Sequence, residues 1–145
     1  MTGSTTSVPG GRAAGRGDHD ATVSSRRSTL VAALVDAAAI IAFAAMGRAS
    51  HEHGLSLGGI ASTALPFLVG VAIGWAACLV ARRRAPLTLG DGLGVWAGTV
   101  IGGMLLRNVT GQGTAGSFIV VAALVTGALL LGWRAARAAV VRRRA

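Results

Sequence analysis

Apolar residues gather along the chain into four long runs, which short polar segments separate. The runs cover residues 29–47, 60–81, 89–106 and 117–133, so each contains 17 to 22 residues. About 20 apolar residues in a helix are enough to cross the hydrocarbon layer of a bilayer. Alanine and glycine dominate the runs and hydrophobicity does not alternate, which argues against strands. The pattern predicts an all-α membrane protein with a four-helix transmembrane bundle over residues 29–134.

The segments outside the bundle are polar. Residues 1–28 are rich in glycine, serine, threonine and arginine and show no apolar periodicity. This composition predicts a disordered, basic N-terminal tail. Residues 135–145 are predicted to form a basic C-terminal tail.

Composition and charge agree with a membrane location. Hydrophobic residues make up 52% of the chain and charged residues 13%, whereas about a quarter of the residues of a soluble domain are charged. The net charge of +9 would suggest a nucleic-acid partner in a soluble protein. Here, 12 of the 14 basic residues, all arginine, lie before the first run, between the second and third, or after the fourth. We therefore expect no nucleic-acid partner.

The same arginines predict the orientation. Basic residues flanking membrane helices gather on the cytoplasmic side, so both termini are predicted to be cytoplasmic. The chain is expected to be a multi-pass protein of the cytoplasmic (cell) membrane. Trp133 and Arg134 are interpreted as an interfacial anchor, with the arginine reaching toward lipid headgroups.

One acidic residue lies within the first run. Asp36 is seven residues into it, and a carboxylate at membrane depth is costly and is a functional-site hypothesis by default. Trp75, Trp96 and Thr126 fall at similar depth on the other helices and carry hydrogen-bond donors. Two interpretations stay open. Asp36 is either a proton-bearing group that fixes helix packing through these donors, or a protonatable gate of a transporter.

The stretch "GRASHEHG" forms the loop between the first two runs, on the predicted outer side. Arg48 and Arg107 are the two arginines on that side, and Glu52 is its one carboxylate. We interpret them as a polar cap in which His51 and His53 are pH-sensitive neighbours. His51, Glu52 and His53 could instead supply three zinc ligands, but the other outer loop offers no further ligand. We expect no metal and no cofactor.

Small residues recur every four positions in the second and third runs. This spacing places them on one ridge of a helix, which lets two helix backbones approach closely. The sequence does not indicate whether the ridges face each other or a second subunit. The predicted packing residues are Gly70, Gly74, Gly90, Gly94, Gly98 and Gly102.

In order and spacing, these features resemble the small membrane proteins of the domain-of-unknown-function 3054 family. The resemblance rests on Asp36, on "GRASH" from Gly47, and on "PFLVGVAIGW" from Pro66. It continues with Trp96, "GGMLLR", "GT", "SFIVVA" and "LGWR". It implies an integral membrane protein with no assigned activity, so no catalytic residue can be carried over.

We therefore expect a small polytopic membrane protein that is not an enzyme. Its predicted role is that of a helix-packing or accessory membrane component. The lipid bilayer is its expected partner, and a second copy of the chain or another membrane protein is the further candidate. The alternative is a small oligomeric transporter or channel with a protonatable Asp36 inside the bundle. A zinc-dependent membrane hydrolase is a third, more distant hypothesis.

Overall fold

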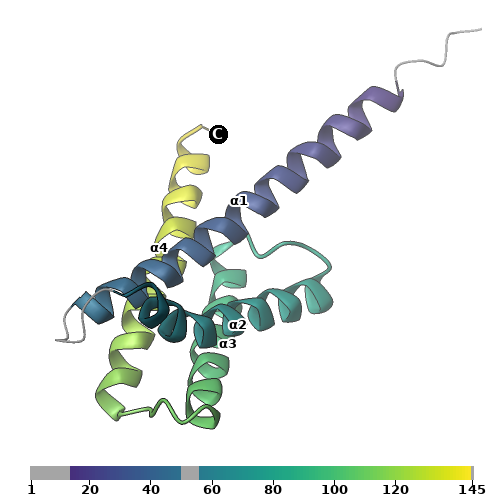
Figure 1. Cartoon of the computed structure of the whole chain (residues 1–145). Helices are drawn as coiled ribbons and strands as arrows, with labels where there is room; N and C mark the ends of the chain where they lie inside the picture. Colours follow the sequence, from purple (N-terminus) through teal and green to yellow (C-terminus); the bar gives the residue numbers. More distant parts are fainter. Residues whose placement is uncertain (1–13, 50–55, 145) are drawn as a thin grey trace, which may run out of the picture.

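The computed structural model describes residues 14–49 and 56–144, with side chains for 22–49 and 56–144. Within these residues the chain folds into four helices (Figure 1): α1 (Ala14–Ala49), α2 (Leu57–Arg82), α3 (Leu89–Val109) and α4 (Gly116–Arg144). Each is long and apolar enough to cross a membrane. For the described part of the chain, the prediction of an all-α protein with four membrane-length helices is confirmed.

Two helices are longer than their apolar runs. Residues 14–28, which we expected to be a disordered tail, instead continue α1, and residues 135–144 continue α4. Adding residues to an existing helix costs less than starting a new one. In α4 the added residues are mostly alanine and arginine, which are strong helix formers. The first 13 residues of the predicted tail lie outside the described residues.

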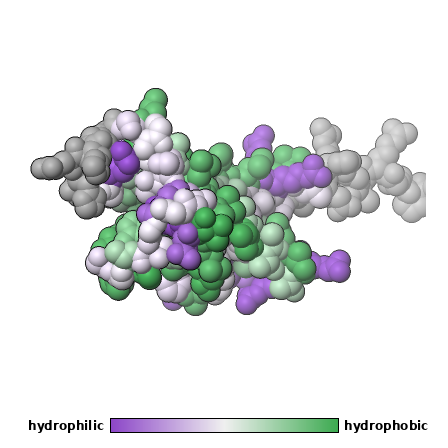
Figure 2. Space-filling model, turned by 60° about the horizontal axis from the view of Figure 1, so that its bottom comes forward, coloured by the Kyte–Doolittle hydropathy of each residue, from purple (hydrophilic) through white to green (hydrophobic). Residues whose placement is uncertain are grey.

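Helix α1 packs against α2 and α4, and α3 packs against the same two helices. The N-terminal part of α1 projects beyond the rest of the molecule (Figure 1). Hydrophobic side chains cover much of the outer surface (Figure 2), and Leu34, Leu65, Leu105 and Leu124 are each more than half exposed. An apolar surface of this extent on a monomer fits a lipid environment.

The closest helix contact joins α2 and α3. A Cβ atom built on Gly98 would lie 2.8 Å from the Cα atom of Gly74, and one on Gly70 would lie 2.7 Å from the carbonyl oxygen of Thr99. One on Gly102 would lie 3.1 Å from the Cα atom of Gly70. These four glycines therefore line one interface within the chain, where any larger side chain would force the backbones apart.

The other two predicted packing glycines lie nearer the beginning of α3 and are less confined. A Cβ atom on Gly94 would meet the sulfur of Cys78 at 3.2 Å. One on Gly90 would have no neighbour within 4 Å among the described residues. The close contact therefore occupies the C-terminal half of the predicted α3 ridge.

Candidate functional site

The buried face of α1 carries the acidic residue that the sequence singled out. Ala32, Asp36, Ile40 and Ala44 follow one another at four-residue spacing, and all four are buried. This spacing lines up side chains on one face of a helix. Asp36 is fully buried, with 0% exposure, because it occupies an interior position of this apolar stripe.

The buried face of α4 brings a cation to the same place. Ala122, Thr126, Leu130 and Arg134 again follow at four-residue spacing, and none is more than 1% exposed. The interpretation of Arg134 as an interfacial anchor is wrong. Its side chain points into the bundle, where it ends the buried stripe of α4.

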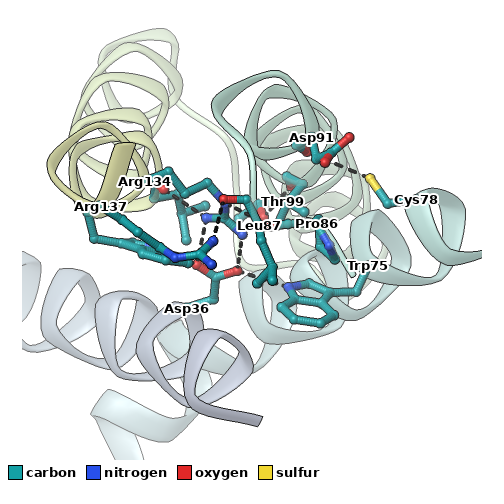
Figure 3. Close-up of polar contacts among 12 residues, drawn as sticks. Asp36, Trp75, Cys78, Pro86, Leu87, Asp91, Thr99, Arg134 and Arg137 are labelled. Atoms are coloured by element: carbon teal, nitrogen blue, oxygen red, sulfur yellow. Dashed lines mark hydrogen bonds and ion pairs between the residues drawn. The ribbon is translucent and has the colours of Figure 1, made fainter. Parts of the chain in front are cut away.

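Asp36 and Arg134 form a bidentate ion pair (Figure 3). The two terminal guanidinium nitrogens donate to separate carboxylate oxygens, over 2.8 Å to Oδ1 and 2.7 Å to Oδ2. The indole N–H of Trp75 donates to Oδ2 over 2.9 Å, and that of Trp133 donates to Oδ1 over the same distance. Each carboxylate oxygen thus accepts two hydrogen bonds. Four donors around two oxygens fit an ionised carboxylate, since a protonated one would place a hydrogen against a donor.

The guanidinium of Arg134 has further partners. Its Nε donates to the carbonyl oxygen of Pro86 over 3.1 Å, and one terminal nitrogen also donates to that of Leu130 over 2.8 Å. Its Cζ lies 4.4 Å from the ring centroid of Trp133, a cation–π contact. A Cβ atom on Gly92 would lie 2.5 Å from the Cδ of Arg134, so the glycine leaves the room that the arginine fills.

The site therefore joins every helix of the described bundle. Asp36 comes from α1, Trp75 from α2, and Trp133 and Arg134 from α4, while Pro86 precedes α3 and Gly92 belongs to it. A buried ion pair is tolerable only when its geometry is good and its remaining donors and acceptors are satisfied. Here both conditions hold, so the arrangement can fix the relative positions of the helices.

Sequence reasoning identified part of this site. The predicted contact between Asp36 and Trp75 is confirmed. The other two predicted donors are not bonded to Asp36. Trp96 donates to the carbonyl oxygen of Ala123 over 2.9 Å, and Thr126 donates to that of Ala122 over 2.6 Å. The actual second indole, Trp133, and the cation Arg134 were missed. The four-residue spacing from Ala122 to Arg134 is the signal that could have found the arginine.

A second buried carboxylate lies where α3 begins. Asp91 is 1% exposed and forms ion pairs with Arg82 and Arg84, which lie at the end of α2 and in the following turn. Thr88 caps α3 by accepting from the backbone N–H of Asp91 over 3.2 Å, and its hydroxyl donates to Oδ2 over 2.7 Å. The Thr88 side chain thus caps the first turn of α3 and also holds the Asp91 carboxylate at the beginning of that helix. It fixes the turn that supplies the Pro86 carbonyl to Arg134.

The predicted outer cap is only partly described. Arg107 donates to the side chain of Gln112 over 2.9 Å, and its Cζ lies 4.3 Å from the ring centroid of Phe118. Arg48 lies over Gly59, where its guanidinium occupies the space that a Cβ atom would need. His51, Glu52 and His53 lie outside the described residues, so the cap and the zinc alternative stay predictions. In the described part of the chain, no three metal-binding side chains are grouped to hold an ion.

Comparison with known proteins places the chain in a family. The family model described as "Protein of unknown function (DUF3054)" matches residues 33–137, which run from α1 to α4 and include the whole Asp36 site. The chain belongs to this family, as the resemblance implied. None of the curated proteins and none of the solved structures matches it.

Proposed function

We propose that this protein is a non-catalytic accessory component of the cell membrane, which acts through helix packing. The observation that carries the proposal is the saturated ion pair between Asp36 and Arg134. All hydrogen-bonding positions of the carboxylate are filled by groups of the same chain. A carboxylate of this kind stabilises one arrangement of helices and leaves no position open for a substrate.

The proposed orientation places both termini in the cytoplasm. Arg27, Leu87 and Arg137 line one cavity, so the N-terminal segment, the α2–α3 turn and the C-terminal segment lie at the same end of the bundle. These are the segments that hold most of the arginines. The positive-inside rule supports assigning that end to the cytoplasmic face.

A second candidate function is that of a small oligomeric transporter or channel. It is favoured by the buried charges themselves, because ionisable residues at membrane depth commonly mark ion pathways. In this case the pair would open during a transport cycle, and Asp36 would exchange its arginine partner for a proton.

Proton flux into sealed vesicles separates the two functions. The purified protein is reconstituted with a pH-sensitive dye inside, and a potassium gradient with valinomycin supplies the driving voltage. The accessory function predicts the same flux as for empty vesicles. Flux that exceeds this level and disappears when both Asp36→Asn and Arg134→Gln are introduced would contradict it and support the transporter.

Cross-linking in native membranes tests whether the protein has a membrane partner. Cross-linking followed by size analysis should show this chain at fixed stoichiometry, with itself or with another membrane protein. A protein that is monomeric after cross-linking at native abundance would argue against an accessory role.

A further inference from the structure

A basic cavity lies at the end of the bundle where α1, the α2–α3 turn and α4 meet. It has a volume of about 260 Å³ and is lined by Arg27 and Ser28 from α1, Leu87 from the turn, and Trp133 and Arg137 from α4. Val31 and Ala32 form an apolar part of its wall. We propose that this cavity binds the headgroup of an acidic phospholipid.

The charge of the cavity suits a phosphate group. Arg27 and Arg137 stand on different helices and both contribute to its lining. Within the described residues, Arg27 makes no ion pair, and Arg137 makes one hydrogen bond, from a terminal nitrogen to the carbonyl oxygen of Leu87 over 3.2 Å. Both guanidinium groups therefore retain free N–H donors. The planar fork of arginine matches phosphate oxygens in pairs.

The position of the cavity along the chain suits a lipid. Arg27 comes just before the first apolar run, and Arg137 comes shortly after the fourth. Both lie where the hydrocarbon layer meets the headgroups, and Trp133, one turn before Arg137, extends from the cavity toward Asp36. Acidic lipids are attracted to basic residues at the cytoplasmic surface, and basic pockets between membrane helices bind their headgroups.

The mixed lining distinguishes a lipid from a free anion. Val31, Ala32 and Leu87 provide apolar surface beside the two arginines, which a diester with attached acyl chains can cover and a free phosphate ion cannot. The cavity is also smaller than the ~300–1,000 Å³ of a pocket for a drug-sized ligand, so it fits a headgroup while the acyl chains stay outside.

The headgroup would lie next to the Asp36 site. Trp133 lines the cavity and also donates to Oδ1 of Asp36. A bound headgroup would therefore stabilise the indole that completes the ion pair. The inference requires that the chain spans a membrane, and it holds for either of the two functions proposed above.

The test uses the full-length protein in neutral detergent. Binding of phosphatidylglycerol and of phosphatidylcholine is measured by native mass spectrometry and by the shift in thermal unfolding. One variant carries Arg27→Gln and Arg137→Gln. The matched control carries Arg26→Gln and Arg142→Gln, which removes the same charge from the same two helices outside the cavity lining. Inorganic phosphate is added in a separate series.

We expect wild type to prefer phosphatidylglycerol and the cavity variant to lose roughly tenfold or more in affinity, as when a charge-assisted hydrogen bond is removed. The control should lose less than about threefold, since it affects only the diffuse surface field. Equal losses in both variants would overturn the proposal. So would displacement of the lipid by inorganic phosphate at equal concentration, which would show a simple anion site.

The single variant Arg27→Gln keeps the test valid if the double variant misfolds. Its side chain makes no hydrogen bond to the described residues, so the fold should be unchanged, which circular dichroism without lipid can verify. It should still lose several-fold in affinity for phosphatidylglycerol when compared with Arg26→Gln. Identical affinities of these two single variants would likewise overturn the proposal.

Discussion

Replacing Asp36 with asparagine should destabilise this protein severely, although the two side chains have the same shape. The substitution leaves the guanidinium of Arg134 buried, at 1% exposure, without its counter-charge. The amide also places an N–H group against one of the three donating residues. Arg134→Gln creates the opposite defect, because it leaves the Asp36 carboxylate buried with only two indole donors.

The magnitude follows from the burial of both charges. Removing one partner of a buried ion pair typically costs ~3–5 kcal/mol. Independent effects of Asp36→Asn and Arg134→Gln would therefore sum to roughly 6–10 kcal/mol in the double variant. The double variant leaves no buried charge at this site, so we expect it to cost only ~1–3 kcal/mol, the value for poorly paired polar groups. It should be more stable than either single variant.

The stabilities of wild type, the two single variants and the double variant form a double-mutant cycle. They are measured by equilibrium unfolding in detergent micelles, monitored by far-ultraviolet circular dichroism and tryptophan fluorescence. Folded yield after size-exclusion chromatography provides a second readout if a single variant is too unstable to measure. Arg142→Gln is the matched control. It lies two turns further along the same helix, is exposed and is outside the cavity lining, so its effect should stay within about 0.5 kcal/mol.

Two results would refute the reasoning. Additive destabilisation in the double variant would show that the two charges do not depend on each other. Wild-type stability of Asp36→Asn would show that Arg134 is hydrated and is not held by the carboxylate.

Three further predictions concern packing, topology and the outer loop. Gly98→Leu should reduce folded yield strongly, because the leucine side chain would meet the backbone of α2. Gly90→Leu on the same helix should be tolerated. Equal yields of the two variants would show that the contact between α2 and α3 is loose. Reporter fusions after Arg84 should be active only in the cytoplasm and those after Gly54 only outside, and an external signal after Arg84 would exclude this topology. Glu52→Gln should lower thermal stability by up to ~1 kcal/mol if the loop forms an exposed cap, and stability that is independent of pH and salt would contradict the cap.

The helices could be predicted because their cause is local. An apolar run of membrane length needs no partner to be recognised, and the four runs correspond to α1, α2, α3 and α4. The ends of the helices were harder to predict than the helices themselves. Residues 14–28 and 135–144 are helical although their polarity resembles that of a tail, because a helix can extend beyond the segment that buries its apolar face.

Only one partner of the buried ion pair could be recognised from the sequence. Asp36 was recognisable because a charge inside an apolar run is rare. Arg134 was not, since it follows directly after an apolar run, where arginines that orient a helix are also found. Whether such an arginine is buried or reaches the headgroups depends on the helix face that carries it and on the residues of the neighbouring helices that it meets. Gly92 illustrates the same limit, because its need for a small side chain arises from the Arg134 side chain, which is distant in sequence.

The ionisation state of Asp36 tests the saturated ion pair most directly. Infrared difference spectra with isotope-labelled aspartate, taken at neutral pH against the variant with Asp36→Asn and Arg134→Gln, isolate this side chain from Asp18, Asp20 and Asp91. The bidentate pair with Arg134 predicts carboxylate bands for Asp36 and no band of a protonated carboxyl group. A protonated carboxyl band that belongs to Asp36 would contradict the ion pair and favour a proton carrier.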